Sequence, residues 1–195
     1  MNKISENLLD KKWAKFLKYR PVFSFIPFLD FVIASGSLVL GKVNENSDFD
    51  VIIGARAGRI FTVRFFCFLF FEMLGIRRDK LDKETSLKDK ICFNHFVTKK
   101  SYKLRPPHNL YWEELYQNLV PVFGKREAVE SFLKANDFLI KGKMSSFERF
   151  RTRDFNLLRS FLELVLGGKL GNFIEEKLKR IQLARIEKTL VAYGT

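Results

Sequence analysis

The stretch ASGSLVLGKVNENSDFDVII, residues 34–53, decides the fold expected for this chain. Just before it begins, a β-branched and aromatic run, residues 31–33, leads toward the pair Gly36-Ser37. A second apolar run, residues 49–53, ends at Gly54. Apolar runs bounded by glycine and polar residues predict strands, so we expect two strands joined by a short helical turn and a polar loop.

Asp48 and Asp50 lie at the start of the second predicted strand, separated by one residue. Side chains two residues apart point to the same side of a strand, which places the two carboxylates a few ångströms apart. Like charges this close raise each other's pKa unless a cation lies between them. Mg²⁺ suits such a pair because it takes one or two carboxylates and completes its shell with water and phosphate oxygens. The pair therefore predicts a site for Mg²⁺ or Mn²⁺.

Gly36 and Ser37 offer the second part of a phosphate site. Glycine lets the backbone approach a phosphate closely, and Ser37 supplies a hydroxyl and an N–H at a predicted helix start. Lys42 adds a positive charge that can reach the same anion. Metal-assisted phosphoryl chemistry needs little from a protein beyond positioning and charge neutralisation.

These residues resemble a known signature. Gly36-Ser37 followed after ten residues by Asp48-Phe49-Asp50 resembles the nucleotidyltransferase superfamily of DNA polymerase beta, and GSLVLG with Ser47-Asp48 is similar to its minimal nucleotidyltransferase branch. The resemblance implies a polymerase beta-like mixed sheet flanked by helices. It also implies transfer of a nucleoside monophosphate from an NTP to a hydroxyl or related acceptor, with release of pyrophosphate.

Carried over by position, the resemblance makes Asp48 and Asp50 catalytic, metal-binding residues. It implies that Gly36 and Ser37 hold the triphosphate of an NTP such as ATP and that Ser47 shapes the approach to the acids. The expected nucleotide-binding residues are thus Gly36, Ser37, Lys42 and Ser47.

A third acid, which many such proteins carry on a later strand, is not evident. The strand expected at residues 90–97 reads KICFNHFV, and its alternation predicts Ile91, Phe93, His95 and Val97 on one face and Cys92, Asn94 and Phe96 on the other. Asn94 can give a metal one neutral oxygen but cannot act as a base. Asp89 reaching in, His95 acting as base and an acceptor supplying its own group remain alternatives, as does a structural role for Asn94 and His95.

The fold class expected is α+β, with helices at residues 5–19 and 60–74. Pro106-Pro107 breaks the pattern, and strand signals disappear beyond it. Helical spacing predicts helices at 111–119, 126–140, 146–166 and 171–192, with a capping box at Ser145-x-x-Glu148 and a stop at Gly167-Gly168. We therefore expect a nucleotidyltransferase domain at 1–105 and a helical domain at 106–195.

The chain has 195 residues and a net charge of +13, and both of its halves are basic. This charge favours a polyanionic partner such as RNA, although a high pI without such a partner is equally compatible. Cys67 and Cys92 lie in apolar segments, which favours free thiols and a cytoplasmic location. No stretch is long and apolar enough for a membrane span, and no secretory signal is evident.

The leading hypothesis is a metal-dependent nucleotidyltransferase that acts on RNA, a small molecule or a protein. The alternative is a catalytically impaired nucleotide- or RNA-binding module of the same fold, because the third acid is missing. A third hypothesis is an interaction protein, with residues 61–71 docking on a protein partner, a second copy or a membrane.

Overall fold

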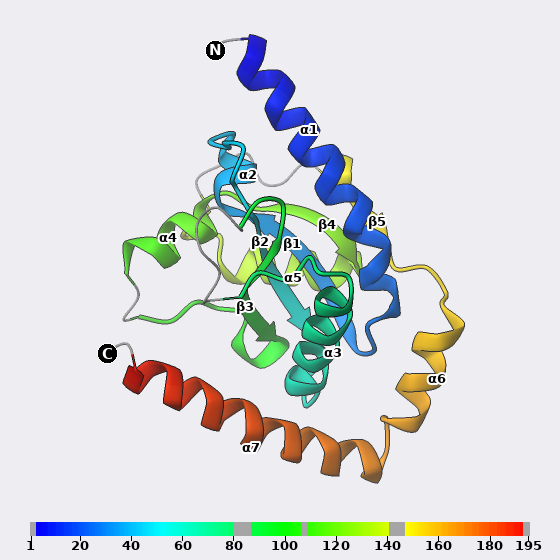
Figure 1. The fold of residues 1–195 in the computed structure, drawn as a ribbon. Coiled ribbons are helices and arrows are strands. Elements are labelled where there is room, and N and C mark those ends of the chain that lie inside the picture. The colour runs from blue at the N-terminus through cyan, green and yellow to red at the C-terminus, as the bar shows by residue number, and fades with distance from the viewer. Residues whose placement is uncertain (1–2, 80–86, 107–108, 141–146, 193–195) are drawn as a thin grey trace.

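The computed structural model describes residues 3–79, 87–106, 109–140 and 147–192. The protein is a mixed α+β structure, as predicted, in which helices flank a five-stranded sheet (Figure 1). Its strands are β1 (Leu29–Ser35), β2 (Phe49–Ala55), β3 (Ile91–Thr98), β4 (Val120–Gly124) and β5 (Arg151–Thr152). Its helices are α1 (Lys3–Tyr19), α2 (Gly36–Leu40), α3 (Ile60–Met73), α4 (Leu110–Gln117), α5 (Arg126–Ala135), α6 (Leu157–Val165) and α7 (Lys169–Ala192), with single 3₁₀ turns at Arg20–Phe25, Lys99–Ser101 and Phe147–Arg149.

The sheet has the strand order β3-β2-β1-β4-β5 and mixed directions. β1 runs antiparallel to both β2 and β4, whereas β2 and β3 are parallel, and so are β4 and β5. The parallel pair requires a crossover, and α3 provides it between β2 and β3. β1 is buried along almost its whole length because it lies in the middle of the sheet.

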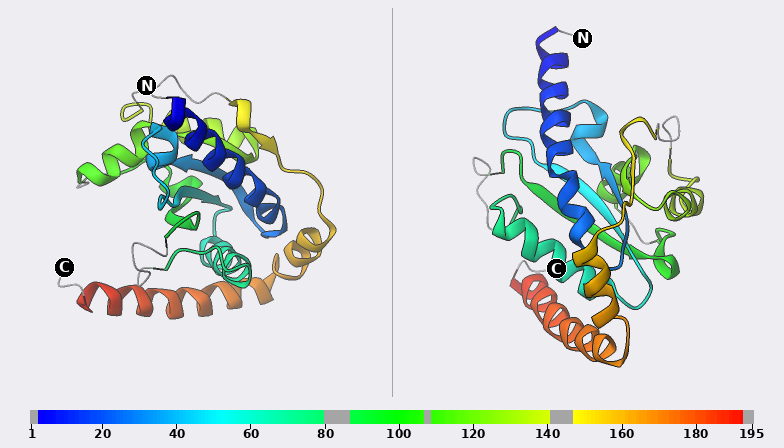
Figure 2. Two further views of the ribbon diagram at one scale, coloured as in Figure 1. Left: turned by 45° about the horizontal axis from the view of Figure 1, so that its top comes forward. Right: turned by 90° about the vertical axis from the view of Figure 1, so that its right-hand side faces the viewer.

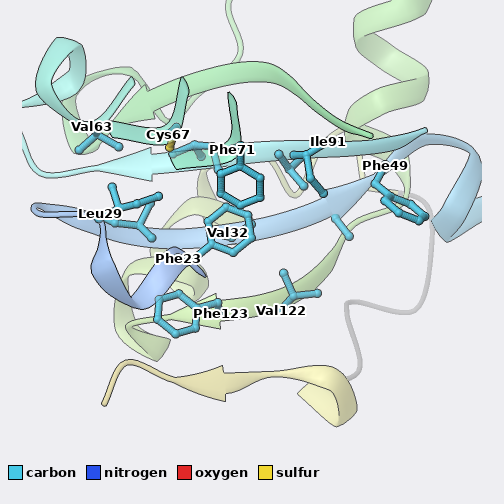
Figure 3. Close-up of a cluster of buried hydrophobic side chains, with 14 of the residues drawn as sticks. Phe23, Leu29, Val32, Phe49, Val63, Cys67, Phe71, Ile91, Val122 and Phe123 are labelled. Carbon is cyan, nitrogen blue, oxygen red and sulfur yellow. The ribbon is translucent and has the colours of Figure 1, made fainter. Parts of the chain in front are cut away.

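Helices cover the two faces of the sheet and enclose two apolar clusters. The larger cluster lies between the sheet and α1, α3 and the 3₁₀ turn Arg20–Phe25, and Figure 3 shows its aromatic and aliphatic side chains. Phe23, Phe71 and Phe123 meet in this cluster, with ring centroids 4.9 Å and 6.4 Å from Phe23. The smaller cluster lies under α4 and α5 on the opposite face, around Phe31, Tyr116 and Phe132. The sheet is therefore the middle layer of three.

Most elements predicted in residues 1–105 are confirmed. The helices expected at 5–19 and 60–74 are α1 and α3, and the strands expected around 31–33, 49–53 and 90–97 are β1, β2 and β3. α3 is buried only on the side that carries Val63, Cys67 and Phe71, while Phe65 and Leu69 are about two-fifths exposed. Among the described residues, no helix is long and apolar enough to cross a membrane.

The expectation that no strand follows residue 106 is wrong. β4 pairs with β1 inside the sheet, and β5 extends it, so strands on both sides of the expected domain boundary build one sheet. Pro121 conceals β4 in the sequence because proline is rare inside a sheet. It is accommodated where the β1–β4 register shifts, opposite Ile33. The helices expected at 111–119 and 126–140 are found as α4 and the shorter α5.

The single helix expected at 146–166 is also wrong. That part of the chain contains a 3₁₀ turn, β5 and α6, and Ser145 of the expected capping box lies outside the described residues. The stop at Gly167-Gly168 is confirmed, because it separates α6 from α7. Figure 2 shows α7 as a long helix that crosses α3 and is joined through α6 to the rest of the chain.

Candidate metal and nucleotide site

Three potential metal ligands gather where β2 and β3 lie side by side. Oxygen atoms of Asp48 and Asp50 and the Sγ atom of Cys92 all lie within 4.8 Å of one another. Asp50 is paired with Cys92 in the parallel register, which places both side chains on the face of the sheet that α4 covers. Two carboxylates and a thiol at this spacing can surround one divalent cation, so the predicted acid pair is brought together as expected.

Gly36 lies against one of these carboxylates. Its φ is +66°, and a β-carbon at this position would lie 2.1 Å from Oδ2 of Asp50. Any other residue would displace the carboxylate and would also adopt a disfavoured backbone conformation. The glycine of the Gly-Ser pair is therefore required by its contact with the second acid, a reason that the sequence alone does not reveal.

A pocket of about 370 Å³ opens beside Asp50 and contains three more predicted site residues, Gly36, Ser37 and Lys42. Its opposite wall is formed by α4 and by Asn118, the residue after this helix. The residues that line the pocket are Gly36, Ser37, Leu40, Lys42, Asp50, Tyr111, Glu114, Leu115, Gln117 and Asn118. The pocket thus combines a carboxylate, a hydroxyl and an ammonium group, which are the groups that a metal-bound phosphate needs.

Ser47 lies outside that lining and organises the loop before Asp48. Its hydroxyl accepts a hydrogen bond from the backbone N–H of Asn44 at 2.8 Å. Its carbonyl oxygen accepts from Nζ of Lys12 at 2.9 Å and from the N–H of Asp89 at 3.2 Å. Ser47 therefore shapes the approach of the chain to the acids, and direct contact with a nucleotide remains a prediction.

Asp89 does not supply the missing acid in this structure. Its two carboxylate oxygens accept hydrogen bonds from Nζ of Lys12 at 2.8 Å and Nζ of Lys15 at 2.7 Å. Burial opposes ionisation, but these two ammonium groups outweigh it and lower the pKa of Asp89. Lys12 also donates to the carbonyls of Glu45 and Ser47, so it fixes the loop that leads to Asp48 from α1.

The predicted alternation along β3 is wrong from His95 onward because Asn94 forms a bulge. Val51 pairs with Phe93 and Ile52 with His95, which leaves Asn94 without a cross-strand partner in this register. Phe93 and Phe96 consequently share a face, where both pack on Phe68 of α3. His95 turns to the other face.

Asn94 contacts the acid pair, but as a hydrogen-bond donor. Its Nδ2 donates to Oδ1 of Asp50 at 2.6 Å, and its Oδ1 accepts from Sγ of Cys92 at 3.1 Å. The side-chain oxygen that would bind a metal is thus engaged by Cys92. Asn94 remains a candidate ligand only if its amide turns over, because the amide nitrogen does not bind metals.

His95 has a hydrogen-bonded position under α4. Its Nδ1 lies 2.7 Å from the hydroxyl of Tyr116, and its ring packs on Trp112 with centroids 4.7 Å apart. Burial lowers its pKa, so the imidazole is neutral at neutral pH. The pairing with Tyr116 favours the structural role that the sequence left open.

Charge at the acid pair is only partly balanced. Burial, followed by the charge of Asp48, raises the pKa of Asp50 to about 6, against the opposing hydrogen bond from Asn94. Nη1 of Arg78 donates to Oδ2 of Asp48 at 2.5 Å. The hydroxyl of Ser35, opposite Asp50 in β1, is buried and has no hydrogen-bond partner among the described residues. An ionised Asp50 and an orphaned hydroxyl side by side fit a cation at this place.

Sequence reasoning missed several residues of this site, among them Cys92, Arg78, Tyr111 and Glu114. Cys92 could have been recognised from the sequence. It lies two residues before Asn94 on the strand expected to carry the third ligand, so the two side chains share a face. Arg78 reaches Asp48 because the backbone around it bonds to Ile91 beside β3. Tyr111 and Glu114 come from α4, whose packing over the acids depends on tertiary structure and leaves no local signal.

The comparisons do not place the chain in a family. No protein-family model matches it, and no curated protein or solved structure matches it either.

Proposed function

We propose that this protein is a metal-dependent nucleotidyltransferase with a polymerase beta-like fold. The observation that carries the proposal is the contact between the two halves of the predicted signature, in which the Asp50 carboxylate lies on Gly36 beside Ser37 and Lys42. Two features of the fold support it. The Gly-Ser pair directly follows β1, and the acids begin the antiparallel neighbour β2.

In this proposal Asp48 and Asp50 hold Mg²⁺ or Mn²⁺. A metal held there would supply positive charge that neutralises the triphosphate and would lower the pKa of an attacking hydroxyl. Ser37 donates its hydroxyl hydrogen to a phosphate oxygen, and Lys42 compensates phosphate charge. Gly36 leaves room for both the carboxylate and the nucleotide. The acceptor oxygen forms a bond to the α-phosphorus, and the bond to the bridging oxygen breaks and releases pyrophosphate.

Glu114 is the candidate for the proton-accepting role that the β3 strand does not fill. It lines the same pocket as Asp50 from the opposite wall, and its side chain is exposed. An exposed carboxylate facing the site can take the proton of the acceptor hydroxyl. Tyr111 beside it is held protonated, because burial and then the charge of Asp50 raise its pKa to about 12. Tyr111 therefore acts as a hydrogen-bond donor or a stacking surface.

A second candidate function is nucleotide or RNA binding without transfer. It is favoured because Asp89 is bonded to two lysines and the side-chain oxygen of Asn94 is engaged by Cys92, which leaves Asp48 and Asp50 as the carboxylates of the cluster. The net charge of +13 supports a large anionic acceptor or ligand such as RNA in either case.

Transfer of label from each α-labelled NTP to RNA, protein or small molecules tests the proposal, with Mg²⁺ or Mn²⁺ present. We expect label in a product with the intact protein and none with Asp48→Asn/Asp50→Asn. Asp10→Asn/Asp137→Asn is the matched control, because both of these acids are exposed and outside the site. Equal labelling by the site variant would refute the proposal. Metal-dependent NTP binding without label in any product would select the binding module.

A further inference from the structure

α6 faces the protein with its polar side and faces outward with its apolar side. Leu157, Phe161 and Leu164, spaced at i, i+4 and i+7, are 76%, 60% and 80% exposed. Arg159 and Glu163, the charged residues of this helix, point inward. A helix that covers a protein core normally has the opposite orientation.

Polar contacts fix this orientation. The guanidinium of Arg159 donates to the carbonyls of Asp154 at 2.7 Å and Ser24 at 3.3 Å. The carboxylate of Glu163 accepts from the N–H of Phe28 at 2.9 Å, from Arg56 at 3.2 Å and from Arg153. Turning the apolar side of α6 inward would leave these buried polar groups unpaired, so the outward apolar side is built into the fold.

α7 continues the same arrangement. Glu175 is buried and accepts from the N–H groups of Phe61 at 3.0 Å and Thr62 at 2.8 Å, at the start of α3. Leu170 and Phe173 of the same helix are more than half exposed. We call the exposed residues Phe155, Leu157, Phe161, Leu164, Leu170 and Phe173 the outer apolar surface.

Positive charge accompanies this surface. Residues 169–192 contain six Lys or Arg and three Glu, and one of these acids is the buried Glu175. The ammonium group of Lys177 lies 5.3 Å from the ring centroid of Phe173, so a cation is directly beside the apolar side chains. Exposed apolar side chains with Lys or Arg beside them are typical of helices that lie in the interface of anionic membranes.

We infer that the outer apolar surface binds an anionic lipid bilayer, with α6 inserted into the headgroup region. The positive charge decides between the possible occupants. A second copy would also carry a charge of +13 and the same basic α7, so two copies would repel, whereas an anionic bilayer attracts. RNA would complement the positive charge of the protein, but it would leave the outer apolar surface exposed to water. The inference does not depend on the proposed enzymatic function.

Co-sedimentation with vesicles tests the inference. The full chain is mixed with vesicles of phosphatidylcholine alone or of phosphatidylcholine and phosphatidylglycerol in equal parts. We expect binding to the anionic vesicles only. Leu157→Gln/Phe161→Gln/Leu164→Gln should weaken it at least about tenfold, and glutamine preserves helix propensity. Lys177→Gln/Arg180→Gln should weaken it about fivefold for each cation removed.

Leu110→Gln/Phe138→Gln is the matched control, because both side chains are more than half exposed but belong to another part of the surface. It should bind like the unmodified protein, and circular dichroism should show all variants folded. Absent binding to anionic vesicles, equal binding to neutral ones or undiminished binding by the α6 variant would each overturn the inference. A dimer in sedimentation velocity that the α6 variant abolishes, without vesicle binding, would identify a second copy as the occupant.

Discussion

Oδ2 of Asp50 lies 2.1 Å from the position that a β-carbon on Gly36 would occupy. Gly36→Ala should therefore displace the carboxylate as well as strain a backbone with φ of +66°. We expect a loss of about 2–4 kcal/mol in the free energy of unfolding and loss of Mn²⁺-dependent NTP binding. Urea denaturation and equilibrium binding measure the two effects.

Gly58→Ala is the control for this substitution. Gly58 has φ of +76°, but nothing lies within 4 Å of a β-carbon there. The substitution should therefore lower the free energy of unfolding by only about 1 kcal/mol and leave nucleotide binding intact. Equal effects of the two substitutions on binding would show that the contact with Asp50 is unimportant.

Cys92 should alter the metal preference of the acid pair. Its Sγ lies within 4.8 Å of ligand oxygens of Asp48 and Asp50, and thiolates favour Zn²⁺ and Co²⁺ over Mg²⁺. Cys92→Ser should lower the affinity for Co²⁺ at least about tenfold and leave the affinity for Mg²⁺ nearly unchanged. The thiolate-to-cobalt absorption band reports the bond directly. The band should survive Cys67→Ala, and its survival in Cys92→Ser would exclude Cys92 as a ligand.

Arg78 engages a carboxylate oxygen of Asp48 that the proposed metal would need. Its Nη1 lies 2.5 Å from Oδ2 of that residue, and its side chain is about one-third exposed. Arg78→Gln should cost at most about 1 kcal/mol of stability and raise the affinity for Mn²⁺ several-fold, measured by titration calorimetry. Arg77→Gln should not change Mn²⁺ binding, because Arg77 pairs with Glu72 and Asp79 instead. Weaker Mn²⁺ binding by Arg78→Gln would mean that the arginine positions the carboxylate.

The buried ammonium group of Lys12 holds the loop that leads to Asp48. Lys12→Met leaves Asp89 and the carbonyls of Glu45 and Ser47 without this donor, so we expect a loss of about 3–5 kcal/mol in unfolding experiments. Lys15→Met removes the other ammonium group that bonds to Asp89. Because Lys15 is half exposed, this substitution should lower the free energy of unfolding by less than about 1 kcal/mol. Similar losses for both variants would contradict the assigned role of Lys12.

Glu163 makes the free energy of unfolding depend on pH in the acidic range. Burial would raise its pKa, but the N–H of Phe28 and the guanidinium groups of Arg153 and Arg56 outweigh burial and lower it. A carboxylate with a lowered pKa stabilises the fold above its ordinary pKa of 4.5, and this contribution is lost as pH falls through the folded-state pKa. Urea midpoints from about pH 7 to about pH 3 should fall less steeply in Glu163→Gln. Parallel pH curves for the two proteins would contradict this assignment.

The sequence predicted the elements whose signals are local. β1, β2 and the acid pair could be recognised because apolar runs there end at glycine or polar residues. β4 could not be recognised, because it contains Pro121. This proline is accommodated at the register shift opposite Ile33, which depends on pairing with β1. The faces of His95, Phe96 and Val97 were predicted wrongly because alternation assumes an unbroken strand, and the bulge at Asn94 depends on pairing with β2.

The pocket was predicted on one side only. Gly36, Ser37, Lys42 and Asp50 come from one continuous stretch, so their proximity follows from spacing. Tyr111 and Glu114 reach the pocket because α4 packs through Leu115 and Tyr116 on the smaller apolar cluster. Such packing depends on the whole fold and cannot be read from one segment.

The position of β4 has a consequence for synthesis of this chain on the ribosome. β1 pairs with β4 through Val32 and Phe123, so the strand that carries the Gly-Ser pair keeps an open, apolar edge until the second half of the chain has emerged. Unpaired strand edges promote aggregation, and long-range pairing folds slowly. A nascent chain ending near residue 105 would thus expose this edge to aggregation, and the stretch that carries the Gly-Ser pair would become ordered only late in translation.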